Sequence, residues 1–468
     1  MILKKSLVCL MFLLPTANIL AESSKIGASY STKAPYLNLS LTEALQMMKE
    51  NNLELKISQF NEQIKAYEAK VAQGHNYGKL DLKVQALRSN DAGNIFGFKL
   101  KSREASFRDF GFAQFDMSGQ SNPLPVQPKD LNYPDARNHF QTTLTYAIPL
   151  YTGGKLDQYG KITKALENMS QLDTSKLLNE KVFQTTKTFY DISLIASYIN
   201  NLSNIVQNID QLESIVGAMK EEGFAKEIDQ LEVQARKAEA QSMLSQAQYN
   251  EKLAYQYLSF LLNQEVKSIQ YINNLAILPQ IDYDLIQSNN LDIQKAQLGE
   301  QITKMAIKLE ESNLLPTVGA FGEYGSSDNN PFNEFTHKDF YTLGLQLDWN
   351  IFNGNINKNN VNRAKVENMK VQEQVKLAKK GISLQIQKLL TEIKGKDAEI
   401  ESLEMQFNFA SQVYENYQER YREGITSISD VLIKQSKELE VLLKLLTAKN
   451  NRNAKVFELT SIINKGEV

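Results

Sequence analysis

Cysteine and histidine, which supply most zinc ligands and many catalytic groups, are scarce in this chain. Its 468 residues include one cysteine, Cys9, and only three histidines, which lack metal-ligand spacing. The sequence has no GxSxG, P-loop or HExxH motif, and Gly153-Gly154 lacks the pattern of a dinucleotide-binding loop. A formal charge of −2 gives no electrostatic case for binding nucleic acid. We therefore predict no enzyme, no cofactor and no metal site; the histidines are His75, His139 and His337.

Two aspartates stand out because each lies six residues after a glycine. Asp229 follows Gly223, and Asp430 follows Gly424. The glycines permit a tight turn between two helices. The run from Ser427 to Asp430 also fits a helix capping box, and the helix dipole favours an acid in a first turn. A functional carboxylate and a structural helix cap are therefore both open interpretations.

The N-terminus is typical of a secretory signal peptide. Lys4 and Lys5 precede a short apolar run over residues 7–14, and Ala21 provides a small residue for cleavage. A buried N-terminal helix is the alternative. No run of 18 apolar residues follows residue 21, so we expect no transmembrane helix.

The remaining chain contains an internal duplication. Residues 51–55 (NNLEL) recur as 289–293 (NNLDI), an offset of 238 positions, whereas Glu222-Gly223 recurs as Glu423-Gly424 at an offset of 201. The first copy therefore carries 37 extra residues, all between residues 64 and 150. A single insertion of this kind indicates a surface loop. We predict a signal peptide over residues 1–21, a first helix–hairpin–helix repeat over 22–270 and a second repeat over 271–468.

Within each copy the apolar period changes from helix to strand and back. Helices are expected over residues 41–73 and 285–312, and Pro316 ends the second of them. Pro149 lies in a strand that runs into the Gly153-Gly154 turn, and Gly354 is its counterpart in the second copy. Alternation of apolar and polar residues predicts four strands, over residues 80–86, 143–150, 317–324 and 343–351.

Very long helices follow the strands. A 3-4 apolar spacing, unbroken from Ile400 to Tyr421 and continued upstream to Val371 with one stutter, predicts a helix from Val371 to Tyr421. It would be roughly 75 Å long at 1.5 Å per residue. In the first copy, two offset apolar stripes run over residues 195–209 and 205–219. Two stripes on one helix indicate two neighbouring helices, as in a barrel of helices. An ordinary helical bundle is the alternative.

Four strands cannot close a membrane barrel, and an open strand edge is not tolerated in lipid. Either the strands lie on a soluble core, or several chains each contribute them to one barrel. Three chains would supply twelve strands around a polar lumen. The segment from about residue 88 to residue 138, rich in Gly, Ser, Asn, Asp and Pro, would then be an exposed outer loop.

These features together resemble the outer membrane efflux duct family, the TolC-like proteins. The resemblance covers nearly the whole chain after the signal. Its motifs are LSLTEAL at 39–45, LPT at 315–317, PLYTGG at 149–154, WNIFNG at 349–354, and the paired turns Glu222-Gly223…Asp229 and Glu423-Gly424…Asp430.

The resemblance implies a mainly α fold with membrane β: a homotrimer with a periplasmic barrel of long coiled-coil helices and a twelve-stranded outer membrane β-barrel. It implies the passive exit duct of a tripartite drug efflux or type I secretion system in a Gram-negative cell. The duct would contact outer membrane lipid and join an inner-membrane pump (RND, ABC or MFS type) through a periplasmic adaptor.

The resemblance also implies a gate. The position of Asp430 lines the aperture, and Tyr421 joins a closing network with Asp229. Thr426 stands where the best-known pattern has an arginine, and Ile433 where it has a second aperture aspartate, so Lys226 or Arg422 are alternative members of the lock. Gly223 and Gly424 mark the turns that meet the adaptor, and Pro149, Gly153, Pro316 and Gly354 mark the junction between barrel and helices.

The competing interpretation is a structural coiled-coil protein of the periplasm or the cell surface. The duplicated strand pairs favour the duct over this alternative. A periplasmic adaptor would need a lipoyl-like half-motif between two helices, and the sequence has none.

Overall fold

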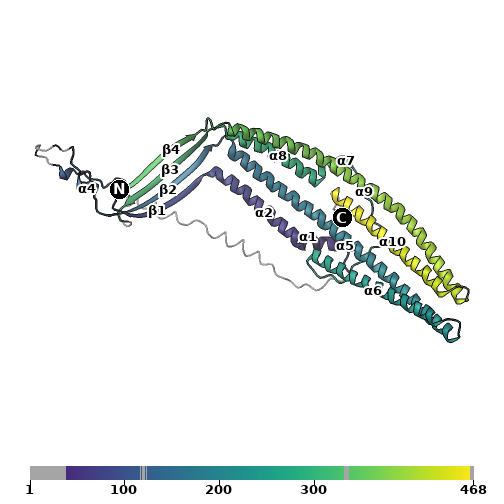
Figure 1. Ribbon diagram of the computed structural model, residues 1–468. Helices are drawn as coiled ribbons and strands as arrows, with labels where there is room; N and C mark the ends of the chain where they lie inside the picture. The colour runs from purple at the N-terminus through teal and green to yellow at the C-terminus, as the bar shows by residue number, and fades with distance from the viewer. Residues whose placement is uncertain (1–37, 116–117, 119–121, 123, 331–336, 464–468) are drawn as a thin grey trace, which may run out of the picture.

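The computed structural model describes residues 38–115, 118, 122, 124–330 and 337–463, so the predicted signal peptide at residues 1–21 lies outside the described residues. Figure 1 shows an elongated molecule with the strands near one end and the turns between the long helices at the other. The helices of the first copy are α1 (Leu41–Asn51), α2 (Leu53–Gly74), α5 (Lys155–Glu221) and α6 (Glu227–Leu262). Those of the second are α7 (Tyr283–Asn289), α8 (Leu291–Ser312), α9 (Ile356–Arg422) and α10 (Ile428–Ile462).

Each copy begins with two helices where the sequence predicted one. The predicted helix 41–73 breaks at Asn52, and the predicted helix 285–312 breaks at Asn290, because both asparagines have an extended ψ (126° and 125°). Each side chain then caps the following helix, accepting a hydrogen bond from Leu55 N at 3.0 Å or from Ile293 N at 3.1 Å. Asparagine is a strong N-cap residue, which explains the break within an otherwise helical pattern.

The helices form a layer four helices wide along its whole length. α5 and α9 each have 67 residues, roughly 100 Å at 1.5 Å per residue. α9 extends the predicted helix 371–421 at its N-terminal end, since it begins at Ile356. Near the sheet, contacts follow the order α2, α5, α8, α9, and towards the far end they follow α6, α5, α10, α9. The two stripes predicted on residues 195–219 are confirmed, since α5 packs against both α6 and α10.

The four strands form one antiparallel sheet in the order β1-β2-β3-β4. They are β1 (Lys79–Ser89), β2 (Arg137–Tyr151), β3 (Thr317–Asp328) and β4 (Asp339–Asp348). The predicted strand 343–351 instead ends at Asp348, because Trp349 leaves the sheet and donates its indole N–H to Leu314 O at 3.1 Å. The predicted strand 317–324 is longer than expected and continues to Asp328.

The alternation of the strands gives the sheet two different faces. Asp81, Thr145 and Glu323 lie side by side on one face through their register pairs. Leu82, Leu144 and Tyr324 lie side by side on the other. The apolar face of β4 is strongly exposed, with Leu343, Leu345 and Leu347 all more than 60% accessible in the single chain.

The segment between β1 and β2 contains more regular structure than the exposed loop predicted over residues 88–138. It includes α3 (Ala92–Lys101) and α4 (Lys129–Asn132), with the short 3-10 turns η4 (Phe107–Phe110) and η5 (Phe112–Gln114) between them. A third 3-10 turn, η3 (His75–Tyr77), joins α2 to β1. Ile95 and Phe98 of α3 are buried, which a solvated loop would not produce.

Candidate functional site

The far end of the helical layer is made of two equivalent turns, one between α5 and α6 and one between α9 and α10 (Figure 1). Gly223 has φ +79° and Gly424 has φ +74°, the left-handed conformation that glycine adopts without strain. Beyond each glycine, Phe224 N donates to Met219 O at 2.7 Å and Ile425 N donates to Arg420 O at 2.9 Å. This is the hydrogen-bond pattern of a Schellman helix end, and it occurs in both turns.

Asp430 lies in the first turn of α10 and is part of a complete capping box. The backbone N–H of Asp430 donates to Ser427 Oγ at 3.2 Å. The Oδ2 atom of Asp430 accepts from Ser427 Oγ at 2.6 Å and from Thr426 Oγ1 at 3.2 Å. The hydrogen bonds from Ser427 and then from Thr426 lower the pKa of the exposed Asp430 carboxyl below its ordinary value. Asp430 is therefore a helix cap and, at neutral pH, also a fixed negative charge at the tip.

Asp229 has a similar place in α6 but a different neighbour. Its Oδ2 accepts from Lys226 N at 2.7 Å. Tyr421, on α9, is 6% exposed, and its pKa is raised first by burial and then by the negative charge of Asp229. Tyr421 thus feels the charge of Asp229, whereas Thr426 donates a hydrogen bond to Asp430.

Two contacts at the tip were not predicted from the sequence. Ser429 on α10 donates to Glu232 Oε2 on α6 at 2.7 Å, which joins the two copies directly. Tyr417 on α9 has two cations near its ring, with Arg420 at 5.5 Å and Lys434 at 5.1 Å from the ring centroid. The spacing of residues within one copy carries no signal for the first of these contacts, because its partners are 197 positions apart.

The predicted junction residues lie where the strands meet the helices. Pro149 lies at a register shift in β2, and Pro316 immediately precedes β3. Gly153 has φ +63°, and a Cβ there would lie 2.8 Å from Ser312 O, so the first copy's turn packs against the end of α8. Gly354, with φ +68°, has open space around it.

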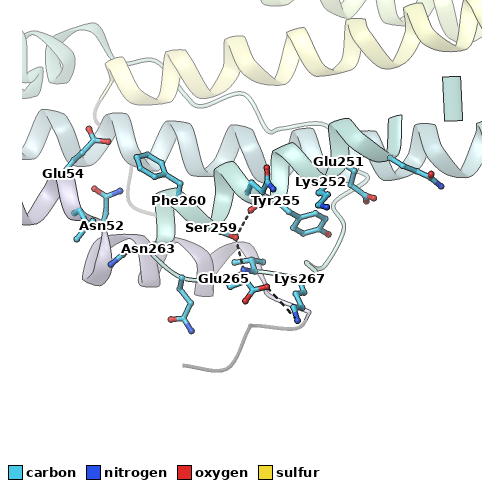
Figure 2. A pocket seen from close by; sticks show the side chains of 15 residues that line it. Asn52, Glu54, Glu251, Lys252, Tyr255, Ser259, Phe260, Asn263, Glu265 and Lys267 are labelled. Atoms are coloured by element: carbon cyan, nitrogen blue, oxygen red, sulfur yellow. Dashed lines mark hydrogen bonds and ion pairs between the residues drawn. The ribbon is translucent and has the colours of Figure 1, made fainter. Parts of the chain in front are cut away.

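A groove of about 780 Å³ lies between the start of α2 and the end of α6 (Figure 2). Ser259 lines this groove, and its Oγ donates to Tyr255 O at 2.8 Å and accepts from Val266 N at 3.0 Å. Glu251 and Lys252 lie on its wall, and burial raises the pKa of Glu251. Among the described residues, no group of three or more His, Cys, Asp or Glu side chains could hold a metal ion.

No helix in the described part of the chain is long and apolar enough to cross a membrane. No curated protein matches the sequence at a significant level. Residues 283–465 match the family model described as outer membrane efflux protein.

Solved structures resemble nearly the whole chain. The CmeC outer membrane channel of Campylobacter jejuni superposes with TM-score 0.75 at 15% identity, covering 94% of this chain and 91% of that one. VceC, an outer membrane protein of Vibrio cholerae, superposes with TM-score 0.71 at 13% identity, covering 91% of this chain and 95% of VceC. The open state of the MtrE outer membrane channel of Neisseria gonorrhoeae superposes with TM-score 0.72 at 12% identity, covering 90% of this chain and 88% of MtrE.

These likenesses establish the fold, which is mostly helical and matches that of the CmeC and VceC outer membrane proteins. Together with the family match over the second copy, they confirm the predicted resemblance to the outer membrane efflux duct family. The function named by the family match over residues 283–465 is outer membrane efflux.

Proposed function

We propose that three copies of this chain form one continuous duct, a twelve-stranded outer membrane barrel joined to a periplasmic barrel of helices. The observation that carries the proposal is that both edges of the single chain are open. Within the described residues, β1 pairs only with β2, and β4 pairs only with β3. In lipid, such edges need partners, and β1 of one copy pairing with β4 of the next would supply them.

The helical layer has matching open edges. An apolar stripe of α2 faces solvent in the single chain, although residues at this 3-4 spacing normally pack against another helix. The opposite edge, α9, also exposes apolar side chains. Head-to-tail contact between these edges closes into a ring, and three copies give twelve strands. The stripe on α2 is Leu53, Ile57, Phe60, Ile64, Tyr67 and Val71, and that on α9 includes Val366, Met369, Leu377 and Leu384.

The two faces of the sheet suit this arrangement. The face with Leu82, Leu144 and Leu345 would contact outer membrane lipid, and the face with Asp81, Thr145 and Glu323 would line a water-filled lumen. We further propose that residues 1–21 are a signal peptide that directs export, and that 22–270 and 271–468 are the duplicated repeats. The element order helix, helix, strand, strand, long helix, helix occurs in each, apart from the helical segment with α3 and α4 that the first copy inserts between its two strands.

At the tip, we assign Asp430 to the aperture and Tyr421 with Asp229 to the lock that closes it. The turns at Gly223 and Gly424 would meet the periplasmic adaptor, which joins the duct to an inner-membrane pump. The exposed side chains of Phe224 and Ile425 provide an apolar docking surface there. The cargo would be drugs or other compounds that the pump expels, carried passively through the duct.

The trimer is tested by a charge placed in the α2 stripe. We expect the protein to be extracted from outer membranes by detergent and to have the mass of three chains by light scattering. Phe60→Asp should abolish the trimer, because it buries an unpaired charge between subunits. Asn61→Asp, which places the same charge outside the stripe, should leave it intact. A soluble, membrane-free monomer would overturn the proposal.

A further inference from the structure

The segment after β1 folds back over the sheet end that lies away from the long helices. Asp91 caps α3 by accepting from Asn94 N at 2.9 Å. The Phe98 ring then stacks on the His139 ring of β2, with centroids 4.1 Å apart and planes within 4°. α3 also contacts β3, so this helix covers two neighbouring strands.

α3 covers the polar face of the sheet. His139 Nε2 and Gln141 Oε1 are 3.3 Å apart, and Gln141 Nε2 donates to Thr143 Oγ1 at 3.0 Å, so these three side chains share one face. Alternation places Thr145 on the same face. In the proposed barrel this face lines the lumen, and α3 therefore lies inside the mouth of the duct.

A small set of ion pairs holds the segment in this position. Glu104, three residues after α3, pairs with Arg137 at the start of β2 and with Lys338 just before β4. Lys338 also pairs with Asp328 at the end of β3, at 2.8 Å. Burial raises the pKa of Glu104, but the hydrogen bonds from Lys338 and Arg137 outweigh burial and hold this pKa below its ordinary value. Glu104 thus stays ionised and joins the ends of β2 and β4 directly, and Lys338 extends the network to the end of β3.

The covered state leaves some buried polar atoms without a hydrogen bond among the described residues. Ser102 Oγ, at the end of α3, is one, and His139 Nδ1, under the Phe98 ring, is another. Unpaired buried polar groups disfavour the state that buries them, and water would reach both atoms if α3 lifted away. The contacts that hold α3 down therefore work against a built-in tendency to open.

We propose that α3 is a lid that narrows the outer mouth of the duct and that Glu104 is its latch. The inference rests on the proposed function, because only a closed barrel makes the polar face a lumen. Three copies would bring three lids into one mouth. Breaking the Glu104 pairs would shift the population of lids towards the open position.

The test measures access to the lumen from outside intact cells, which does not depend on the state of the periplasmic tip. Thr145→Cys serves as a lumen reporter and Leu124→Cys, 89% exposed, as a freely accessible standard. Both are labelled with a membrane-impermeant maleimide, with the unsubstituted protein as the blank. We expect Thr145→Cys to label more slowly than the standard, and Glu104→Gln or Phe98→Ala to accelerate it by about tenfold, because each removes a main contact of the lid. Asp130→Asn, which removes an exposed ion pair with Arg108 at 3.6 Å, should change nothing.

The outcomes separate the lid from the duct. Trimer content on gels shows which variants fold. If Phe98→Ala does not fold, the labelling rate of the Glu104→Gln variant alone decides the outcome. Equal labelling of Thr145→Cys with and without the Glu104 carboxylate, or labelling as fast as the standard, overturns the lid. Leu345→Cys on the apolar face should resist labelling in the membrane. Rapid labelling of Leu345→Cys would instead overturn the proposed barrel itself.

Discussion

Asn52 Nδ2 donates to Leu261 O at 2.8 Å, and Asn290 Nδ2 donates to Ile462 O at 2.8 Å. Each asparagine thus breaks one helix and contacts the end of another more than 170 positions away. The same contact in both halves supports the proposed duplication. It also fixes where α2 and α8 begin relative to α6 and α10.

Removing this contact should destabilise the helical layer. We expect Asn52→Ala to lower the free energy of unfolding by about 1–3 kcal/mol, because a buried carbonyl loses its donor and α2 loses its N-cap. Denaturant melts followed by circular dichroism would measure the change. Lys49→Ala, on an exposed position of α1, should stay within about 0.5 kcal/mol of the original protein. An equally small effect of Asn52→Ala would contradict the structural role given to this side chain.

The glycines of the fold should differ in their tolerance of alanine. Gly424→Ala should cost about 1–2 kcal/mol, since φ is +74° but a Cβ would meet no atom within 4 Å. Gly153→Ala should cost more, because its Cβ would also lie 2.8 Å from Ser312 O. Gly395→Ala, inside α9 and with open space, should stabilise by about 0.5–1 kcal/mol. Thermal melts of the three variants would rank them, and a stabilising Gly153→Ala would refute the close packing at this junction.

The sequence predicted the strands, the long helices and the turns, because each depends on local apolar period or on a glycine at a turn. It did not predict the breaks at Asn52 and Asn290, since the apolar period continues across both. The folded lid was also missed, because the polar composition of residues 88–138 hides the buried Ile95 and Phe98. At the tip, Asp430 was identified, but the bond from Ser429 to Glu232 joins residues from different copies and leaves no local pattern.

Asp430 should contribute to ion selectivity if it lines the aperture. Asp430→Ala, or Asp430→Asn, which keeps an acceptor for Ser427, should lower the cation selectivity of single channels in planar bilayers, since each removes one negative charge per chain. Asp284→Asn, in the first turn of α7, should leave selectivity unchanged and controls for a general charge effect. Unchanged selectivity in both Asp430 variants would reject the aperture assignment and leave Asp430 as a helix cap.

Tyr414 should make the helical core sensitive to alkaline pH. Burial, and then the negative charge of Glu438, raise the pKa of Tyr414 to about 12 from an ordinary value of 10.0. Because the folded pKa is the higher one, this residue stabilises the fold fully below pH 10, and the contribution is lost as the pH rises towards about 12. Tyr414→Phe should remove this part of the alkaline destabilisation. Ultraviolet difference titration of the two proteins should show one phenol ionising near pH 12, whereas a difference centred near pH 10 would mean that Tyr414 is solvated.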